Sequence, residues 1–318
     1  MAEIRVGISG WTYPPWRGNF YPKGLPQKKE LAFASRWFNA LEINGTFYSL
    51  QTPSSFETWY EETPADFVFT LKGGKFVTHL RKLKEPRQGL ANYFASGLLR
   101  LREKLGPILW QFPPEFGFDE ERFKTFFDML PRDMESMARF GKGHDDRVKG
   151  GVFLEVDKNR PVRHAVEFRH KSFLSDRFLD LLCKHNVALV AADAASKFPT
   201  AEDVTADFVY VRLHGSRQLY ASGYTPTEIS TWADKIRAWH KGTEPKDARR
   251  IGPKSPNAKR GRDVYVFFDN TDVKRRAPVD ARRMAEQLEI GPTNSMKEVL
   301  DELGVKSKPG AKSSKRTH

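Results

Sequence analysis

Four stretches of this chain that read as β-strands end in polar side chains spaced two residues apart. The pairs are Glu42 and Asn44, Thr70 and Lys72, Glu167 and Arg169, and Arg212 and His214. A strand directs residues i and i+2 to the same face, so each pair points one way while its apolar neighbours point the other. Parallel strands that end in inward polar groups and alternate with helices are typical of a (β/α)₈ barrel. The pattern therefore predicts an α/β protein built as a single TIM barrel.

Eight strand candidates recur along the chain with helical stretches between them, as expected for a parallel sheet. They lie near residues 4–9, 40–44, 66–72, 107–112, 163–168, 187–192, 207–213 and 264–269. Helix-start signals stand at Pro26, Pro53, Asp119, Ser175, Thr225 and Pro278. Eight strands are the number that a closed barrel needs.

A chain of 318 residues fits one such barrel with additions. We expect the barrel domain over residues 1–292, with a small insertion at about 131–162 and a basic loop at about 241–262. Residues 293–318 are expected to form a short helix near 294–303, capped by Asn294 or Ser295, followed by a disordered basic tail.

The composition is that of a soluble protein, with 29% charged residues and a mean hydropathy of −0.60. No run approaches the roughly 18 apolar residues of a membrane-spanning helix. The chain enters a strand directly instead of offering a signal segment, so we expect a cytoplasmic protein without a membrane partner. The single cysteine, Cys183, excludes an internal disulfide and is expected in the core, because it lies among helix-spaced apolar residues.

The formal net charge of +13 is concentrated in two segments. Residues 241–262 and the tail 304–318 together carry 11 of the 13 net positive charges. One interpretation is that these two segments are solvated surface additions, and the other is that they bind RNA or DNA with an affinity that depends on salt. No aromatic residues are interleaved with these charges, which favours the first interpretation.

A set of polar side chains is expected at the carboxyl ends of the strands. It comprises Glu42, Asn44, Lys72, Gln111, Glu167, Arg169, Asp193, Arg212, His214, Asp269 and Asn270. Charged side chains are rarely buried unless they are paired or bind something. The set contains three cations, Lys72, Arg169 and Arg212, and they therefore imply opposing carboxylates, an anionic ligand, or both. The planar guanidinium in particular matches carboxylate or phosphate.

This set favours an enzyme that acts on a small phosphorylated or carboxylated substrate by acid/base chemistry, as a hydrolase, lyase or isomerase. Lys72, Arg169 and Arg212 would hold the anion. Glu42 and Glu167 would orient the cations or move protons, and His214 is the proton-transfer candidate. The remaining substrate-binding candidates are Asn44, Gln111 and Asn270, as neutral hydrogen-bonding groups, and Asp193.

Three alternatives stay open. A divalent metal could use the carboxylates at the rim together with His214, although no HxH, HxxxH or DxD spacing occurs there and the cations would repel it. The protein could instead be a nucleic-acid-binding protein or phosphodiesterase that binds a nucleic-acid backbone at the basic end of the barrel, with further contacts from residues 241–262 and the tail. The polar network could also be structural only, as in a non-catalytic scaffold. No P-loop or GxGxxG motif indicates a nucleotide cofactor.

A series of motifs resembles a known family in order and spacing. They are GISGW at 7–11, FYP at 20–22, EINGTFY at 42–48, TH at 78–79, GPILWQFPP at 106–114, VEFRH at 166–170, YVRLHG at 210–215 and FFDN at 267–270. Over residues 4–290 the chain resembles the family called domain of unknown function 72, or YecE-like. The resemblance implies a TIM barrel and no established activity. Ile8 and Asp269 depart from the expected Thr or Ser and Asn, and Asp269 adds a carboxylate to the barrel mouth.

Overall fold

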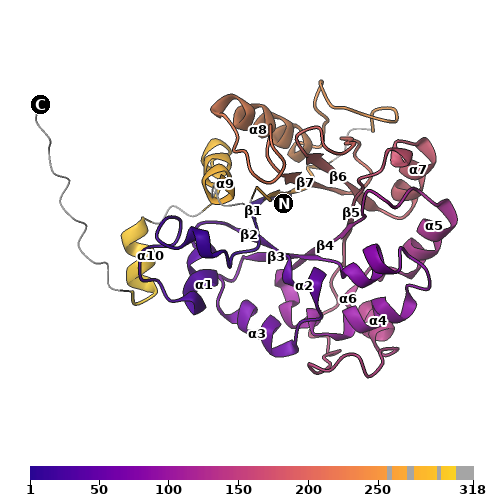
Figure 1. Ribbon diagram of the computed structural model, residues 1–318, viewed down its shortest axis with the longest axis horizontal. Helices are drawn as coiled ribbons and strands as arrows, with labels where there is room; N and C mark the ends of the chain where they lie inside the picture. Colours follow the sequence, from indigo (N-terminus) through magenta and orange to yellow (C-terminus); the bar gives the residue numbers. More distant parts are fainter. Residues whose placement is uncertain (256–259, 271–275, 292–294, 306–318) are drawn as a thin grey trace, which may run out of the picture.

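The fold is an eight-stranded closed barrel. The computed structural model describes residues 1–255, 260–270, 276–291 and 295–305. Strands pair in chain order, every pair is parallel, and the eighth pairs with the first. They are β1 (Ile4–Ser9), β2 (Ala40–Ile43), β3 (Val68–Lys72), β4 (Leu105–Gln111), β5 (His164–Glu167), β6 (Val187–Asp193), β7 (Phe208–Leu213) and β8 (Asp263–Phe268). The predicted fold class is confirmed, and Figure 1 shows the helices arranged around the central strands.

Ten α-helices are found in the described residues. They are α1 (Glu30–Ala34), α2 (Gly45–Tyr48), α3 (Pro53–Glu61), α4 (Arg87–Ala95), α5 (Glu120–Met129), α6 (Met134–Gly141), α7 (Asp176–Lys184), α8 (Pro226–His240), α9 (Arg276–Gln287) and α10 (Met296–Glu302). A π-helix, Phe76–Leu80, follows β3. The caps explain several starts: the side chains of Asp119 and Thr225 accept hydrogen bonds from the third backbone N–H of α5 and α8.

Two helix predictions differ from the structure. The segment after Pro26 forms a 3₁₀ turn before α1, so the α-helix is only five residues long. Helix α9 begins at Arg276, two residues before Pro278. Proline is tolerated there because the first four backbone N–H groups of a helix have no intrahelical acceptor.

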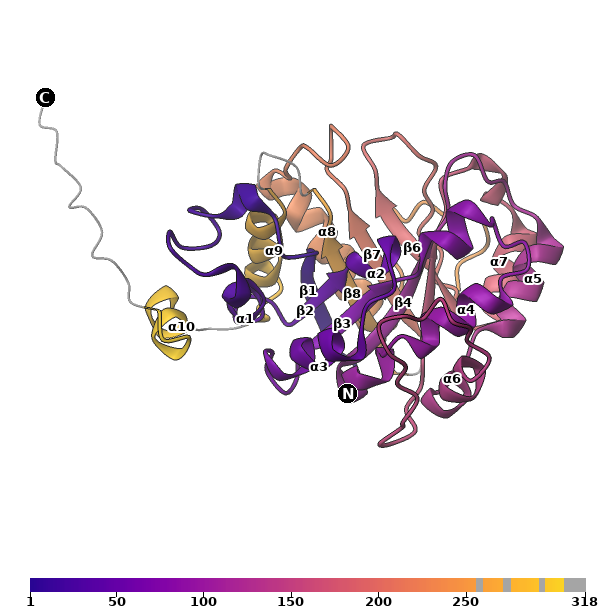
Figure 2. The ribbon, with the colours of Figure 1, turned by 60° about the horizontal axis from the view of Figure 1, so that its bottom comes forward.

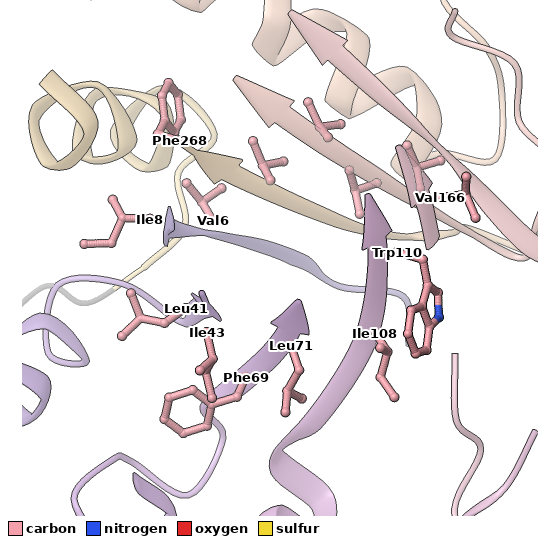
Figure 3. Packing of buried hydrophobic residues seen from close by; sticks show 14 of the residues in the cluster. Val6, Ile8, Leu41, Ile43, Phe69, Leu71, Ile108, Trp110, Val166 and Phe268 are labelled. Atoms are coloured by element: carbon pink, nitrogen blue, oxygen red, sulfur yellow. The ribbon is translucent and has the colours of Figure 1, made fainter. Parts of the chain in front are cut away.

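The barrel strands divide their side chains between two cores. The outward face packs beneath the helices, and Figure 3 shows members of this layer, including Val6, Leu41, Leu71 and Val166. The inward face forms a smaller cluster: Ala40, Leu109, Ala165, Ala188, Val190, Ala192, Phe208, Tyr210, Tyr265 and Phe267. These inward residues alternate with outward ones, as a period of two requires. The alternation fixes which polar residues face into the barrel.

The additions to the barrel lie at its periphery. The expected insertion contains α6, and Asp133 caps it. Helix α10 lies beside α1 in both ribbon views (Figures 1 and 2), where Arg36 pairs with Glu302 at 2.8 Å. Ser295 and Glu298 form a capping box, which decides between the two predicted caps. The predicted domain boundary at residue 292 and the tail 306–318 lie outside the described residues.

The described part of the basic loop is tied to the barrel. Asp203 accepts hydrogen bonds from the backbone N–H groups of Ile251 and Gly252, and the N–H of Glu202 donates to the carbonyl of Arg249 at 2.7 Å. This anchoring differs from the solvated loop expected from composition. The prediction for Cys183 is also wrong: its side chain is exposed, because the buried face of α7 is made by Phe178, Leu179, Leu181 and Leu182.

Candidate functional site

The register of the strands places most of the predicted residues on the inner face of the barrel, at its carboxyl end. Ser9 is level with Glu42, and Glu42 is level with Thr70. Across the barrel Gln111 is level with Glu167. Neighbouring parallel residues at one level face the same side, so side chains from distant parts of the chain meet there.

Arg212 is the centre of this arrangement. Its side chain has no exposed surface, and its nitrogen atoms donate to three carboxylates. Nε and Nη2 reach the two oxygens of Glu42 at 3.1 and 2.7 Å. Nη1 lies 2.5 Å from Glu167 Oε2, and Nη2 also reaches Asp269 Oδ2 at 3.0 Å. Because three carboxylates surround Arg212, its pKa is raised well above the ordinary value despite burial.

Glu42 is held by further donors on the inner wall. Ser9 Oγ donates to its Oε1 at 2.7 Å, and the Tyr210 hydroxyl lies 2.7 Å from its Oε2. The same hydroxyl is 2.9 Å from Thr70 Oγ1. Burial and the neighbouring Glu42 raise the pKa of Tyr210 well above its ordinary value, so the phenol stays protonated. Glu42 is thus completely surrounded by hydrogen-bond donors, as a buried carboxylate requires.

Arg169 is fixed on three sides. Its Nε and Nη2 donate to Glu167 Oε1 at 3.2 and 3.1 Å, and Nη2 also donates to the Tyr220 hydroxyl at 2.7 Å. The guanidinium lies 4.6 Å from the ring centroid of Phe198. Tyr220 has a φ of 62°, a left-handed conformation that is costly for a bulky residue. The Nη1 group of Arg169 has no hydrogen bond to any other described residue, so it can donate to a ligand.

His214 lies between two carboxylates. Its Nδ1 is 3.0 Å from Asp269 Oδ2, and its Nε2 is 3.5 Å from Glu167 Oε1. Burial disfavours the imidazolium, but Glu167 and the hydrogen bond with Asp269 outweigh burial and raise the pKa of His214. Burial likewise opposes ionisation of Asp269, yet Arg212 and His214 lower its pKa to about 2. The site therefore places an imidazole whose pKa is raised beside two carboxylates, Glu167 and Asp269, whose pKa values are lowered.

Lys72 is the third cation at this end of the barrel. Its Nζ lies 4.5 Å above the ring of Phe47. Burial and the nearby positive charge of Arg212 lower the pKa of Lys72 to about 8. His79 also contacts Phe47, ring to ring at 4.9 Å, and burial lowers its pKa to about 4, so it is neutral at pH 7.

Three buried polar atoms among the site residues have no hydrogen-bond partner within the described part of the chain. They are Asn44 Oδ1, Gln111 Oε1 and His214 Nε2. Buried polar groups in folded proteins are normally satisfied, and exceptions call for an explanation such as a ligand. These three atoms come from strand ends that share the inner face of the barrel, whereas other unsatisfied atoms, such as Trp16 Nε1 and Trp239 Nε1, lie elsewhere in the fold. Their shared position at the barrel mouth would suit a common ligand.

Two predicted residues are not part of this arrangement. Asp193 follows Ala192, which is the residue level with Arg212, so Asp193 points to the outer face and accepts a hydrogen bond from Ala195 N at 3.3 Å. Asn270 follows Asp269, and its Nδ2 donates to Asp280 of α9 at 2.9 Å. Both residues lie one position away from the inner face.

Several residues that contribute to the site were not assigned to it from the sequence. Ser9 and Tyr210 share the inner face with Glu42 and Arg212, and the two-residue spacing between Tyr210 and Arg212 could have indicated this. Tyr220 lies in the loop after β7 and meets the ring of His214 edge-on at 5.4 Å. No periodic signal marks a loop residue of this kind.

The described residues contain no group of three or more His, Cys, Asp or Glu side chains arranged to hold a metal ion. The reason is geometric: the guanidinium of Arg212 occupies the position among Glu42, Glu167 and Asp269 that a dication would need. Over the same part of the chain, none of the helices has both the length and the apolar character to cross a bilayer.

Comparisons with known proteins agree with the fold. The chain is 24% identical over 255 residues to the UPF0759 protein YecE of Escherichia coli (strain K12), covering 76% of this chain and 84% of that protein. It is 30% identical over 128 residues to the UPF0759 protein YunF of Bacillus subtilis (strain 168), covering 37% and 43%.

Two solved structures of DUF72 family proteins share the architecture. The protein from Thermotoga maritima MSB8 has a TM-score of 0.66 at 24% identity, covering 90% of this chain and 99% of that one. The protein from Enterococcus faecalis V583 has a TM-score of 0.62 at 17% identity, covering 92% and 99%. At these identities the likeness shows the fold alone. Residues 5–302 match the family described as "Protein of unknown function DUF72", and the chain therefore belongs to that family.

Proposed function

We propose that this chain is an enzyme that binds a small anionic substrate, carboxylated or phosphorylated, at the carboxyl end of the barrel and acts on it by acid/base chemistry. The observation that carries the proposal is the state of His214. Its Nδ1 is fixed by Asp269, while the buried Nε2 makes no well-formed hydrogen bond within the described residues and lies 3.5 Å from Glu167 Oε1. A fixed imidazole with one unsatisfied nitrogen is suited to exchange a proton with a ligand.

The cations divide into two roles in this proposal. Arg212 holds the carboxylates, because its donors are already directed at Glu42, Glu167 and Asp269. Arg169 and Lys72 bind the anion, because Nη1 of Arg169 and Nζ of Lys72 have no hydrogen bond within the described residues. Arg169 is held by Glu167, Tyr220 and Phe198, so little side-chain entropy would be lost when it binds.

The carboxylates support this chemistry in different ways. Glu42 is saturated by Arg212, Ser9 and Tyr210, which suits a positioning residue and not a proton carrier. Glu167 lies between Arg212, Arg169 and His214, and this position next to the imidazole suits an exchange of protons. Asn44 and Gln111 offer the neutral acceptors that a substrate hydroxyl or amine would satisfy.

The test is calorimetric titration of protein purified without phosphate or sulfate, with inorganic phosphate and malonate as probes. We expect one site, with affinity at least tenfold weaker in Arg169→Met. Arg177→Met is the matched control, because that side chain is 82% exposed on α7. Absence of binding by the wild-type protein, or equal binding by Arg169→Met, would contradict the proposal.

A further inference from the structure

Lys72 differs from the two most deeply buried lysines in the described chain. Lys104 donates to the carbonyls of Tyr60 and Thr63, and Lys235 pairs with Glu202 at 2.7 Å. These two ammonium groups are satisfied in the way that buried charges require. Within the described residues, Lys72 Nζ makes neither a hydrogen bond nor an ion pair, and only the ring of Phe47 lies against it. Lys72 is half-buried, and within the described residues no structural partner fixes its amine.

The surroundings of Lys72 lower its pKa and so increase the fraction of neutral amine. Burial and Arg212 oppose the ammonium form, while Asp269, Glu42 and Glu167 act in the other direction without reaching ion-pair distance. His79 and Arg169 also face this region. Besides burial, the charges of Lys72 and Arg169 lower the pKa of His79, and the charge of Glu167 raises it. With a pKa of about 8, roughly a tenth of Lys72 carries a free amine at pH 7, compared with well under a hundredth for an ordinary lysine.

We propose that Lys72 is a catalytic nucleophile that forms an imine with the carbonyl group of an oxo acid or a phosphorylated ketone. This inference rests on the proposed function and divides its two cations: Arg169 holds the anionic group of the substrate, and Lys72, which binds phosphate or malonate as the ammonium, reacts with a carbonyl group as the free amine. An amine on the inner wall, at the same end of the barrel as Glu167 and His214, has the parts that imine formation uses.

The step balances with groups that are present at the site. The lone pair of Nζ attacks the carbonyl carbon, a C–N bond forms, and the C=O π bond breaks. The imidazolium of His214 protonates the oxygen, while the nitrogen gives a proton to Glu167, and the product is a carbinolamine. Glu167 then returns its proton to the hydroxyl group, which leaves as water as the C=N bond forms. The iminium carries the positive charge that His214 had, and it withdraws electrons from an adjacent C–H or C–C bond.

The experiment is reductive trapping. Wild-type protein is incubated with pyruvate, 2-oxoglutarate or dihydroxyacetone phosphate and sodium cyanoborohydride, and intact-mass and peptide-mapping spectra are recorded. We expect one adduct per chain with at least one probe, mapped to Lys72, with a trapping rate that rises with pH and levels off above about 8. Lys75→Met is the control, because Lys75 lies three residues beyond the end of β3, with its Nζ 5.6 Å from the ring centroid of Tyr48.

Two variants distinguish loss of the reactive amine from loss of the fold. Lys72→Met and Lys72→Arg should both lose the adduct, and the arginine variant keeps the positive charge while its guanidinium cannot form an imine. An adduct that persists in these variants, or a wild-type protein that yields none at Lys72, overturns the proposal. Calorimetric titration with the same probes distinguishes failure of the imine proposal from failure of the proposed function. Binding that depends on Arg169 but gives no trapped adduct contradicts only the imine proposal. Absence of binding contradicts both.

Discussion

The guanidinium of Arg212 on β7 donates to both carboxylate oxygens of Glu42 on β2, from Nε at 3.1 Å and from Nη2 at 2.7 Å. This bidentate pair joins strands that are not neighbours in the sheet, and neither side chain has exposed surface. A paired geometry of this kind is among the stronger charge-assisted interactions. It makes Arg212 the structural centre of the barrel mouth.

Removing Arg212 leaves three carboxylates without their shared cation. We predict that Arg212→Met lowers the free energy of unfolding by about 3–5 kcal/mol, the usual cost of breaking a buried pair from one side. Urea denaturation measures the loss, and the exposed Arg177→Met should change stability by less than about 0.5 kcal/mol. A variant as stable as the wild type would show that the network is not required for folding.

The hydroxyl group of Tyr210 donates within the same network. Tyr210→Phe removes the hydrogen bonds with Glu42 and Thr70 and leaves the ring in place. We predict a loss of about 1–3 kcal/mol, because a buried acceptor loses a donor. Tyr48→Phe, at a side chain 66% exposed, is the matched control and should change stability by less than about 0.5 kcal/mol. A neutral effect of Tyr210→Phe would mean that Arg212 and Ser9 satisfy Glu42 without it.

The stability of the fold should depend on pH through Asp269. Its folded pKa of about 2 is below the unfolded value, so its contribution to stability is complete above about pH 4 and is lost as the pH falls through 2. We predict that Asp269→Asn flattens part of the acid decline between pH 4 and 2. Part of the decline in stability should remain in this variant, because Glu167, whose pKa is also lowered, still becomes protonated as the pH falls. Asp234→Asn, at a side chain 74% exposed, should reproduce the wild-type profile.

The nucleic-acid hypothesis and the small-anion hypothesis differ on the role of the tail. Deleting residues 306–318 should leave the affinity for phosphate unchanged, because the proposed anion site is made by Arg169 and Lys72. If a nucleic-acid backbone is the natural ligand, the deletion should weaken binding of a 20-nucleotide single strand and reduce the slope of log K against log salt. Fluorescence anisotropy of the labelled strand between 50 and 200 mM salt measures both quantities.

The fold could be predicted from the sequence because alternation and length leave few solutions. Each expected strand lies within two residues of an observed one, and the inward direction of Glu42, Lys72, Glu167 and Arg212 followed from the spacing alone. Which face of the sheet a side chain points to is harder to predict at the end of a strand. Asp193 is predicted to face inward, whereas in the structure Ala192 takes the inward position beside Arg212, because a run of small residues carries no contrast between the two faces.

The contacts within the site could not be predicted for a different reason. Which carboxylates meet Arg212 depends on the stagger of the strands around the barrel, which no local pattern encodes. The sequence suggested that Arg212 binds a ligand, whereas its donors are directed at Glu42, Glu167 and Asp269. Tyr220 reaches Arg169 from a loop whose left-handed backbone has no sequence signature in a tyrosine.

The central claim is that the carboxyl end of the barrel binds an anion through Arg169 and Lys72. The most direct measurement is a crystal structure of protein purified without phosphate or sulfate and then soaked in phosphate or malonate. The account predicts density within hydrogen-bond distance of Arg169 Nη1, Lys72 Nζ and His214 Nε2, absent from unsoaked crystals. A mouth that stays empty, with Arg212 and its three carboxylates unchanged, would contradict it.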